Sequence, residues 1–286
     1  MKVIIAKKSG FCLGVKGAIE LARKTVRENK AGKVVALGPL IHNRQVVEEL
    51  EKVGLNQAGN LEDLETNTTL LIRSHGAPPE TFARAKQLGL NIVDATCVLV
   101  RRAQKIVKQL HEEGYQVVMI GDGEHPEVKG VIGYAPNVIV VDRKEELEEA
   151  LPQKGKIGIV AQTTHAPEHV GAMIAAITSR PFDEVKVVNT LCMEVVRRQK
   201  AALELCEHVD VMFVLGGLHS ANTQALAKIC MEKGIPTYHL ECWNQFKPEM
   251  ANGHQCAGIT AGASTPDYII NEFAENLKTY QTILQT

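Results

Sequence analysis

The chain has 286 residues, of which 32 are Lys or Arg and 33 are Asp or Glu, so its formal net charge is −1. A composition of 45% hydrophobic and 23% charged residues is typical of a globular protein with an ordinary core. The balanced charge disfavours bulk binding to nucleic acid. No apolar run approaches the length of a membrane span, and the N-terminal run at residues 3–6 is too short for a signal-peptide core.

These features predict a cytoplasmic protein with no nucleic-acid or membrane partner. Thiols stay reduced in that compartment, so the seven cysteines require a use other than disulfides. At roughly 150 residues per domain, the length alone predicts about two domains.

Three cysteines recur in the same setting along the chain. Cys12, Cys97 and Cys192 each follow a short apolar segment and precede a stretch with helical periodicity, which is weakest after Cys192. We expect the apolar segments to be short buried strands. These predicted strands cover residues 3–5, 92–93 and 185–188.

Two further patterns follow each of these cysteines in the same order. The first is an apolar strand, a glycine and a polar residue four positions later, in KVVALGPLIHN, QVVMIGDGEHPE and DVMFVLGGLHSAN. The second is a strand, a small or polar turn and a proline followed by an acid, in LLIRSHGAPPE, GIVAQTTHAPE and AGITAGASTPD. Proline and an acid suit the first turn of a helix.

This repeat predicts an α/β fold of three similar modules with mainly parallel sheets, arranged with pseudo-threefold symmetry. We place the modules at residues 13–96, 97–191 and 192–286, with the N-terminal strand at 1–12 closing the ring. Each strand before a cysteine could belong to either neighbouring module. Ligands of parallel sheets bind beyond the carboxyl ends of the strands, which is where the repeated polar residues lie.

The three repeated cysteines are candidate metal ligands. Zinc and an iron–sulfur cluster both accept thiolates, but structural zinc sites generally use local pairs such as CxxC, and none occurs here. Three widely spaced cysteines favour a 4Fe–4S cluster with one iron left open, as suits a catalyst. Buried cysteines in small turns are the structural alternative. Cys206 and Cys230 fall on apolar helical faces, and Cys242 and Cys256 have no repeat counterpart, so we expect packing roles for these four. A fourth cluster ligand at Cys242 or Cys256 is the alternative.

A second set of repeated residues consists of neutral hydrogen-bond donors that suit an anion. Its members are His42, His75, His125, Thr163, Ser220, Asn222 and Ser264. Glu127 follows His125 by two residues, so it is either a helix-dipole residue or a proton donor in a dry site. Thr163 could orient that proton. Six other histidines, at 111, 165, 169, 208, 239 and 254, lack this placement and are expected to be surface or local residues.

Together these residues resemble a known family, 4-hydroxy-3-methylbut-2-enyl diphosphate reductase, the iron–sulfur enzyme that ends the methylerythritol phosphate route to isoprenoids. The resemblance covers nearly the whole chain. It is carried by GFCLGV, GPLIHN, RSHGAP, DATC, the GxxxHPEV of residues 121–128, AQTT, the LC that ends at Cys192, and TAGASTPD. The family has three α/β modules arranged as a trefoil around its cluster.

The resemblance also implies residue roles. Cys12, Cys97 and Cys192 would hold the 4Fe–4S cluster, while Glu127 and Thr163 would deliver a proton to the allylic hydroxyl of the substrate. His42, His75 and His125 would line the substrate pocket, and Ser220, Asn222 and Ser264 would bind the diphosphate. Two electrons would arrive singly from a ferredoxin or flavodoxin, since no nicotinamide or flavin motif is present. The C–O bond would break with loss of water, and protonation would give isopentenyl and dimethylallyl diphosphates.

Several positions depart from the family pattern, mostly in the third module. Val98 stands where a proline is usual, and residues 193–200 read MEVVRRQK in place of a stretch like NATxxRQE. Leu218 and His219 replace the Lys and Asn of GGKNS. A lost cation, together with Glu194 beside a cluster cysteine, would weaken diphosphate binding. Two alternatives are therefore a paralogue with the same cluster but a less anionic substrate, and a non-catalytic iron–sulfur sensor or electron-transfer module.

Overall fold

The computed structural model describes residues 1–29 and 32–284. Its strands form three four-stranded sheets in which every neighbouring pair is parallel. The first sheet has the order β1 (Lys2–Ile5), β12 (Cys256–Ala261), β10 (Val211–Leu215), β11 (Thr237–Leu240). The second has the order β5 (Asn91–Asp94), β4 (Thr69–Ile72), β2 (Val34–Leu37), β3 (Leu55–Ala58). The third has the order β9 (Glu184–Val187), β8 (Lys156–Ala161), β6 (Gln116–Ile120), β7 (Ile139–Val141).

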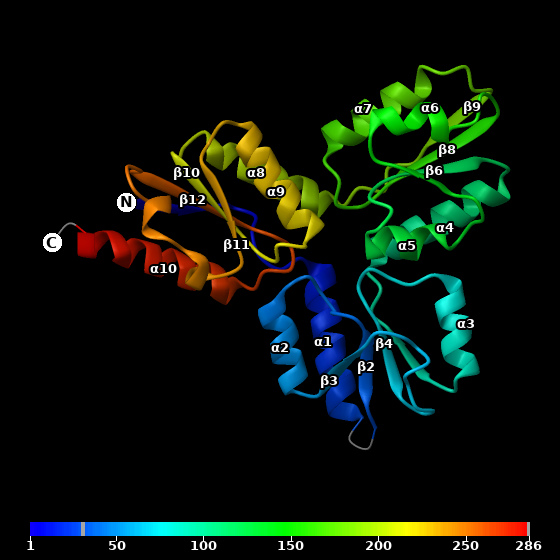
Figure 1. Ribbon diagram of the computed structural model, residues 1–286, viewed down its shortest axis with the longest axis horizontal. Coiled ribbons are helices and arrows are strands. Elements are labelled where there is room, and N and C mark those ends of the chain that lie inside the picture. Colours follow the sequence, from blue (N-terminus) through cyan, green and yellow to red (C-terminus); the bar gives the residue numbers. More distant parts are fainter. Residues whose placement is uncertain (30–31, 285–286) are drawn as a thin grey trace. The chain divides into compact units, whose positions relative to one another are not determined.

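The helices alternate with these strands along the chain (Figure 1). The α-helices are α1 (Leu13–Glu28), α2 (Arg44–Lys52), α3 (Pro79–Gln87), α4 (Val98–Glu112), α5 (Pro126–Ile132), α6 (Leu147–Ala150), α7 (Pro167–Thr178), α8 (Met193–Cys206), α9 (Ala221–Glu232) and α10 (Asp267–Leu284). Short 3₁₀ helices are η1 (Lys144–Glu146), η2 (Trp243–Gln245) and η3 (Pro248–Met250). The predicted fold class of three parallel α/β modules is confirmed by the three sheets.

Strand pairing assigns the strands that the sequence left open. The strand before each repeated cysteine lies at the edge of its sheet. Its neighbour is the strand of the second repeated pattern, the one that ends in a proline and an acid: β5 pairs with β4, and β9 pairs with β8. The N-terminal strand β1 pairs with β12, with Lys2 opposite Cys256 and Ile5 opposite Ile259. The first residues of the chain therefore complete the sheet formed by its last residues.

The chain forms two compact units, one of residues 1–16, 41–48 and 193–286, and the other of residues 17–40 and 49–192. The first unit contains the sheet of β1, β10, β11 and β12, and the second contains the other two sheets. Within the second unit the two modules meet closely at α5, because a Cβ on Gly130 would lie 2.9 Å from the carbonyl oxygen of His75. The side chain of Gln104 also donates a hydrogen bond to the Gly130 carbonyl at 3.1 Å.

Each module buries both faces of its sheet, as parallel sheets require. In the β6–β9 sheet, α4 and α5 cover one face and α6 and α7 cover the other (Figure 1). In the β10–β12 sheet, α8 and α9 pack on one face and α10 on the other. All five residues of β10 are buried. Among the described residues, no helix combines the length and apolar character that crossing a lipid bilayer requires.

Half of the chain's aromatic residues lie in one cluster under α10. Trp243 stacks on Phe246 with ring centroids 4.4 Å apart, and Phe273 packs edge-on against both rings. The whole cluster comprises Phe213, Tyr238, Trp243, Phe246, Phe273 and Tyr280. Cys206 and Cys230 are fully enclosed in the core on the opposite face, which confirms the packing role predicted for them.

Gly158 allows α4 to approach the sheet of its module. It is the third residue of β8, and a Cβ there would lie 3.0 Å from a Leu110 methyl group and 3.2 Å from Tyr115 Cβ. Gly258 holds the same position in β12, where an added Cβ would crowd Leu205, Val209 and Met212. Two modules thus depend on a glycine at the same point of the repeat.

We predict that Gly158→Ala destabilises the protein by about 1–3 kcal/mol, because the added methyl overpacks a closed core. Gly171→Ala is the matched control, since Gly171 lies within α7 of the same module and an added Cβ there meets nothing within 4 Å. Alanine in a helix is preferred over glycine by roughly 0.5–1 kcal/mol, so this variant should be neutral or more stable. Thermal unfolding measures both, and equal midpoints for the two variants would contradict the packing argument.

Candidate active site

The three repeated cysteines are held by one recurring backbone contact. In each case the cysteine amide N–H donates to a carbonyl in the turn that follows the adjoining strand: β12, β4 or β8. The N···O distances are 3.1 Å from Cys12 to Ala263, 3.0 Å from Cys97 to Ser74 and 2.9 Å from Cys192 to Thr163. The edge strand and its neighbour therefore fix the cysteine from two sides, and a helix begins at the next residue.

Each of these cysteines directly precedes or caps a helix that begins at Leu13, Val98 or Met193. Free N–H groups and the helix dipole favour negative charge at such a position. The Val15 N–H already points at Cys12 Sγ, at 3.4 Å. All three thiols are half-buried, neither sealed in the core nor fully exposed. These thiols therefore fit the donor chemistry of an iron–sulfur cluster.

Glu127 and Thr163 form a buried pair in the second unit. Glu127 is the second residue of α5 and is only 3% exposed. The Thr163 N–H donates to Glu127 Oε1 at 2.7 Å, and the Thr163 hydroxyl donates to Oε2 at 2.8 Å. Burial raises the pKa of Glu127, while the two hydrogen bonds from Thr163 act in the opposite direction. The Glu127 carboxyl group therefore keeps its proton to a higher pH than an exposed glutamate does. The two hydrogen bonds from Thr163 hold it in one orientation.

His125 and His75 lie beside this pair. His125 caps α5, where its Nδ1 accepts a hydrogen bond from the Glu127 N–H at 3.1 Å. Burial lowers the pKa of His125, so the neutral ring carries its proton on Nε2, since Nδ1 accepts. The His75 ring packs edge-on against the His125 ring with centroids 5.7 Å apart. The second unit thus brings together the Glu127–Thr163 pair, the neutral His125 ring and the His75 ring that packs against it.

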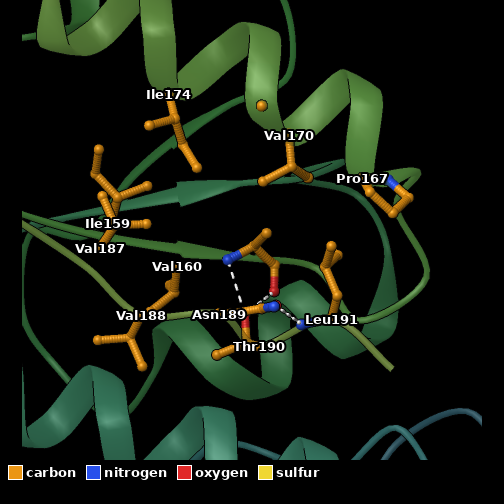
Figure 2. A pocket seen from close by; sticks show the side chains of 12 residues that line it. Ile159, Val160, Pro167, Val170, Ile174, Val187, Val188, Asn189, Thr190 and Leu191 are labelled. Carbon is orange, nitrogen blue, oxygen red and sulfur yellow. Dashed lines mark hydrogen bonds between the residues drawn. The ribbon is translucent and has the colours of Figure 1, made fainter. Parts of the chain in front are cut away.

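The loop that carries Cys192 is anchored to β8 and borders an apolar pocket. The Thr190 hydroxyl accepts from the Ala161 N–H at 2.9 Å and donates to the Ala161 carbonyl at 2.5 Å. Asn189 accepts from the Leu191 N–H at 2.9 Å. Figure 2 shows these residues on one side of the pocket, with Val170 and Ile174 of α7 opposite. The loop before Cys192 is therefore rigidly placed.

In the first unit, Ser220 and Ser264 stand at strand-to-helix turns. Ser220 is buried and caps α9, accepting a hydrogen bond from the Thr223 N–H at 3.4 Å. Ser264 donates to the His42 carbonyl at 3.1 Å. Gly217 is required beside this carbonyl, because a Cβ there would collide with the His42 oxygen. The turns that hold Ser220, Ser264 and His42 therefore lie against one another.

Asn222 gives the clearest sign of a missing polar partner. Its side chain is buried, in the first turn of α9, yet neither its amide nitrogen nor its carbonyl oxygen has a hydrogen-bond partner among the described residues. The neighbouring Thr223 hydroxyl is also buried, with no hydrogen-bond partner in the described part of the chain. Buried polar groups in proteins are normally satisfied. A polar ligand at this end of α9 would satisfy them.

The altered segment of the third module makes its own contacts. The Leu218 N–H donates to Glu241 at 3.3 Å, and Gln224 donates to the Leu218 carbonyl at 2.7 Å. Glu194 forms ion pairs with Arg197 at 3.1 Å and with Lys8 at 3.9 Å. The negative charge expected beside Cys192 is thus accompanied by two positive side chains of its own unit.

The predicted residues divide between the two units, each of which is described by itself. The first unit holds Cys12, His42, Ser220, Asn222 and Ser264. The second holds His75, Cys97, His125, Glu127, Thr163 and Cys192.

A further cluster was missed by the sequence argument. Asp142, His165 and His169 place three potential ligand atoms within 4.8 Å of one another, although both histidines were expected to be surface or local residues. The hydrogen bond with His165 is the main cause that lowers the pKa of Asp142 to about 2. The HxxxH spacing of the two histidines was the available signal.

Three parallel four-stranded sheets, each flanked by helices, define a three-module α/β protein in which a helix begins directly after each repeated cysteine. The family model described as LytB protein matches residues 3–278. The chain belongs to the LytB family.

Known relatives match the chain over almost all of its length. Three of them are called 4-hydroxy-3-methylbut-2-enyl diphosphate reductase. The protein of Citrifermentans bemidjiense is 43% identical over 97% of this chain and 97% of its own. The protein of Pelobacter propionicus is 44% identical over 95% of this chain and 96% of its own length. The protein of Caldanaerobacter subterraneus is 41% identical over 97% of this chain and 97% of its own length.

Two solved structures are similar to this chain. The structure of (E)-4-hydroxy-3-methyl-but-2-enyl diphosphate reductase, described as the terminal enzyme of the non-mevalonate pathway, has a TM-score of 0.70 at 40% identity. It is covered over 100% of its length and covers 98% of this chain. The Plasmodium falciparum reductase gives a TM-score of 0.90 at 24% identity, with 96% of this chain and 87% of that chain covered, and supports the fold alone.

We predict that Thr163→Val raises the pKa of Glu127 further, because the variant loses the hydroxyl hydrogen bond that favours the carboxylate. Thr163→Ser keeps a hydroxyl and should leave the pKa near that of the unaltered protein. The carboxyl stretching band of Glu127, followed by infrared difference titration against Glu127→Gln, gives the pKa. A lower value in Thr163→Val than in Thr163→Ser would refute the assignment of that hydrogen bond.

Proposed function

We propose that this chain is itself a 4-hydroxy-3-methylbut-2-enyl diphosphate reductase, which removes the allylic hydroxyl as water and forms isopentenyl and dimethylallyl diphosphates. Membership of the LytB family and relatives of 41–44% identity with that name support the reaction. The observation that carries the proposal is the buried Glu127–Thr163 pair beside His125. A reductive dehydroxylation consumes two electrons and two protons, and it needs a proton donor of this kind in a water-poor site.

Cys12, Cys97 and Cys192 are proposed to hold a 4Fe–4S cluster. Three thiols at helix starts, each fixed by its amide, support this assignment. When bound, such a cluster supplies single electrons and leaves one iron without a protein ligand. The protein's part is to hold each thiol by its own backbone contact, so that each cysteine needs little local ordering when the metal is loaded.

Glu127 is proposed to supply the proton that leaves with the hydroxyl. Its raised pKa keeps the carboxyl protonated at a pH where an exposed glutamate has already ionised. The Thr163 hydroxyl is within hydrogen-bond distance of Oε2, so it can rotate to accept or donate as Glu127 loses and regains its proton. The neutral His125 ring can donate from Nε2 to a substrate oxygen without adding charge.

Ser220, Asn222 and Ser264 are proposed to bind the diphosphate, and His42, His75 and His125 to line the rest of the substrate site. The unsatisfied side chain of Asn222 supports this, because an anion oxygen would satisfy the amide that the described residues leave without a partner. Neutral donors at helix starts can hold an anion without a surplus of lysines. A chain with a net charge of −1 can bind it in this way.

The electrons are proposed to come from a ferredoxin or flavodoxin, since the sequence carries neither a nicotinamide nor a flavin motif. The cytoplasm is the proposed compartment, because a reducing environment keeps the cysteines available to metal.

A second candidate is a paralogue that keeps the cluster but reduces a less anionic substrate. Leu218 and His219 favour it, since they stand where the family pattern has Lys and Asn. If the purified protein carries a normal cluster but does not bind the allylic diphosphate, the result would favour this second candidate.

We predict that Glu127→Gln lowers kcat about 10²- to 10⁴-fold with 4-hydroxy-3-methylbut-2-enyl diphosphate and a strong one-electron donor, because the amide cannot donate the proton. Glu124→Gln is the control: Glu124 lies in the turn just before α5, is exposed and pairs with Lys129 at the surface. It should retain full activity. The assay is anaerobic, on enzyme with reconstituted iron. Equal activity in the two variants would remove Glu127 from the proposed role.

The cluster assignment predicts that Cys97→Ser loses most of its bound iron and sulfide, because one of three ligands is gone. Cys256→Ser is matched to it, since Cys256 is also half-buried but is assigned no ligand role. Iron and sulfide per chain, together with the visible absorption spectrum after anaerobic purification, measure both. An unchanged spectrum in Cys97→Ser would overturn the three-cysteine assignment.

A further inference from the structure

We propose that Asp142, His165 and His169 form a second metal site that binds one zinc ion and ties the β8–α7 turn to the end of β7. This site uses none of the three repeated cysteines. It lies within one module of the second unit, so its geometry depends on a single sheet and its helices.

The ligand atoms are already close to a zinc geometry. His165 Nε2 lies 2.7 Å and His169 Nε2 lies 3.1 Å from Asp142 Oδ1, and the two rings stand edge-on with centroids 5.3 Å apart. Tetrahedral zinc with bonds of about 2.0–2.1 Å separates its ligand atoms by about 3.3 Å. Small side-chain rotations would therefore open enough room for the ion, with no movement of the backbone.

The backbone that carries the ligands is fixed by other contacts. Asp142 follows β7, and its N–H donates to the Glu146 carboxylate at 2.8 Å. The His165 N–H donates to the Gln162 carbonyl at 3.2 Å. His169 lies in the first turn of α7, two residues after Pro167 begins the helix. Two backbone hydrogen bonds and the first turn of α7 thus prearrange the ligands, which reduces the ordering that metal binding would otherwise require.

The donor set favours a transition-metal ion such as zinc over calcium and magnesium. Two imidazoles and one carboxylate suit zinc, whereas calcium and magnesium prefer oxygen alone. The side chains of His165, His169 and Asp142 are 16%, 40% and 42% exposed, so the cluster opens to solvent on one side. That side gives the ion an entry path and leaves a position for a water molecule as fourth ligand.

The site acts on the turn that contains Thr163. His165 is two residues after Thr163, and the turn between them joins β8 to α7. A zinc ion bound by both His165 and Asp142 would hold this turn against the end of β7 more firmly than the present hydrogen bond between the two side chains does. The inference does not depend on the proposed reaction, since it concerns the folded module alone.

The test uses the cluster-loaded protein under anaerobic conditions, so that the cysteines are already engaged. Equilibrium dialysis against zinc chloride should give about one zinc per chain and no loss of iron. His169→Gln and Asp142→Asn should each weaken zinc binding at least 10-fold. His111→Gln is the control, because His111 is an exposed histidine at the end of α4 outside this cluster. If His169→Gln and Asp142→Asn bind zinc as tightly as His111→Gln does, the proposal is overturned.

Two further measurements keep the inference open to refutation. Zinc should raise the thermal midpoint of the unaltered protein and of His111→Gln by several degrees, but not that of His169→Gln, since a ligand stabilises the state that binds it. X-ray absorption at the zinc edge should show nitrogen and oxygen ligands. Sulfur in that shell would place the zinc on cysteines and would refute the site.

Discussion

The hydrogen bond from each repeated cysteine's amide to the turn after the adjoining strand is the constraint on which the candidate site depends. Parallel strands that are neighbours end at the same edge of a sheet, so the edge strand delivers the cysteine where the next strand delivers the turn. The same turns also carry, or directly adjoin, the residues that we assign to substrate and proton. Ser264 follows Ala263, His75 follows Ser74, and Thr163 is itself an acceptor. One backbone contact therefore sets the position of a thiol and of a polar group together, in each of the three modules.

Burial favours the uncharged forms of the titratable side chains Glu127 and His125. A carboxyl group enclosed as fully as Glu127 pays a large desolvation cost when it ionises, and the two hydrogen bonds from Thr163 recover only part of that cost. The His125 ring is kept neutral by the same burial. Asn222 presents a dipole without a charge. Each of these groups can, in its own unit, offer a hydrogen bond or a proton without adding an ionised side chain.

The sequence predicted the fold because each module repeats the same hydrophobic strands, glycines and helix starts, and these signals are local. Residues 3–5, 92–93 and 185–188 lie in or overlap strands β1, β5 and β9. The N-terminal strand was expected to close the ring, but the sequence left open which sheet each strand before a cysteine joins, because pairing such as that of β1 with β12 connects segments far apart in the chain. The Asp142 cluster escaped for a similar reason: its carboxylate comes from a strand end and its imidazoles from a turn and a helix that begin more than 20 residues later. The ion pairs of Glu194 were equally hidden, since Lys8 lies in a distant segment.

Thr163 links, within the second unit, the acid that we propose as proton donor and a cysteine that we propose as metal ligand. Its N–H and hydroxyl both bind Glu127, while its carbonyl accepts the amide of Cys192. All of its polar groups are therefore committed, and displacement of the β8–α7 turn would disturb the acid and the cysteine loop together. Thr190 strengthens the same arrangement by fixing that loop to the end of β8. The acid and the thiol are thus oriented by one short stretch of backbone, so any change of side chain that shifts this turn should affect both functions rather than either one alone.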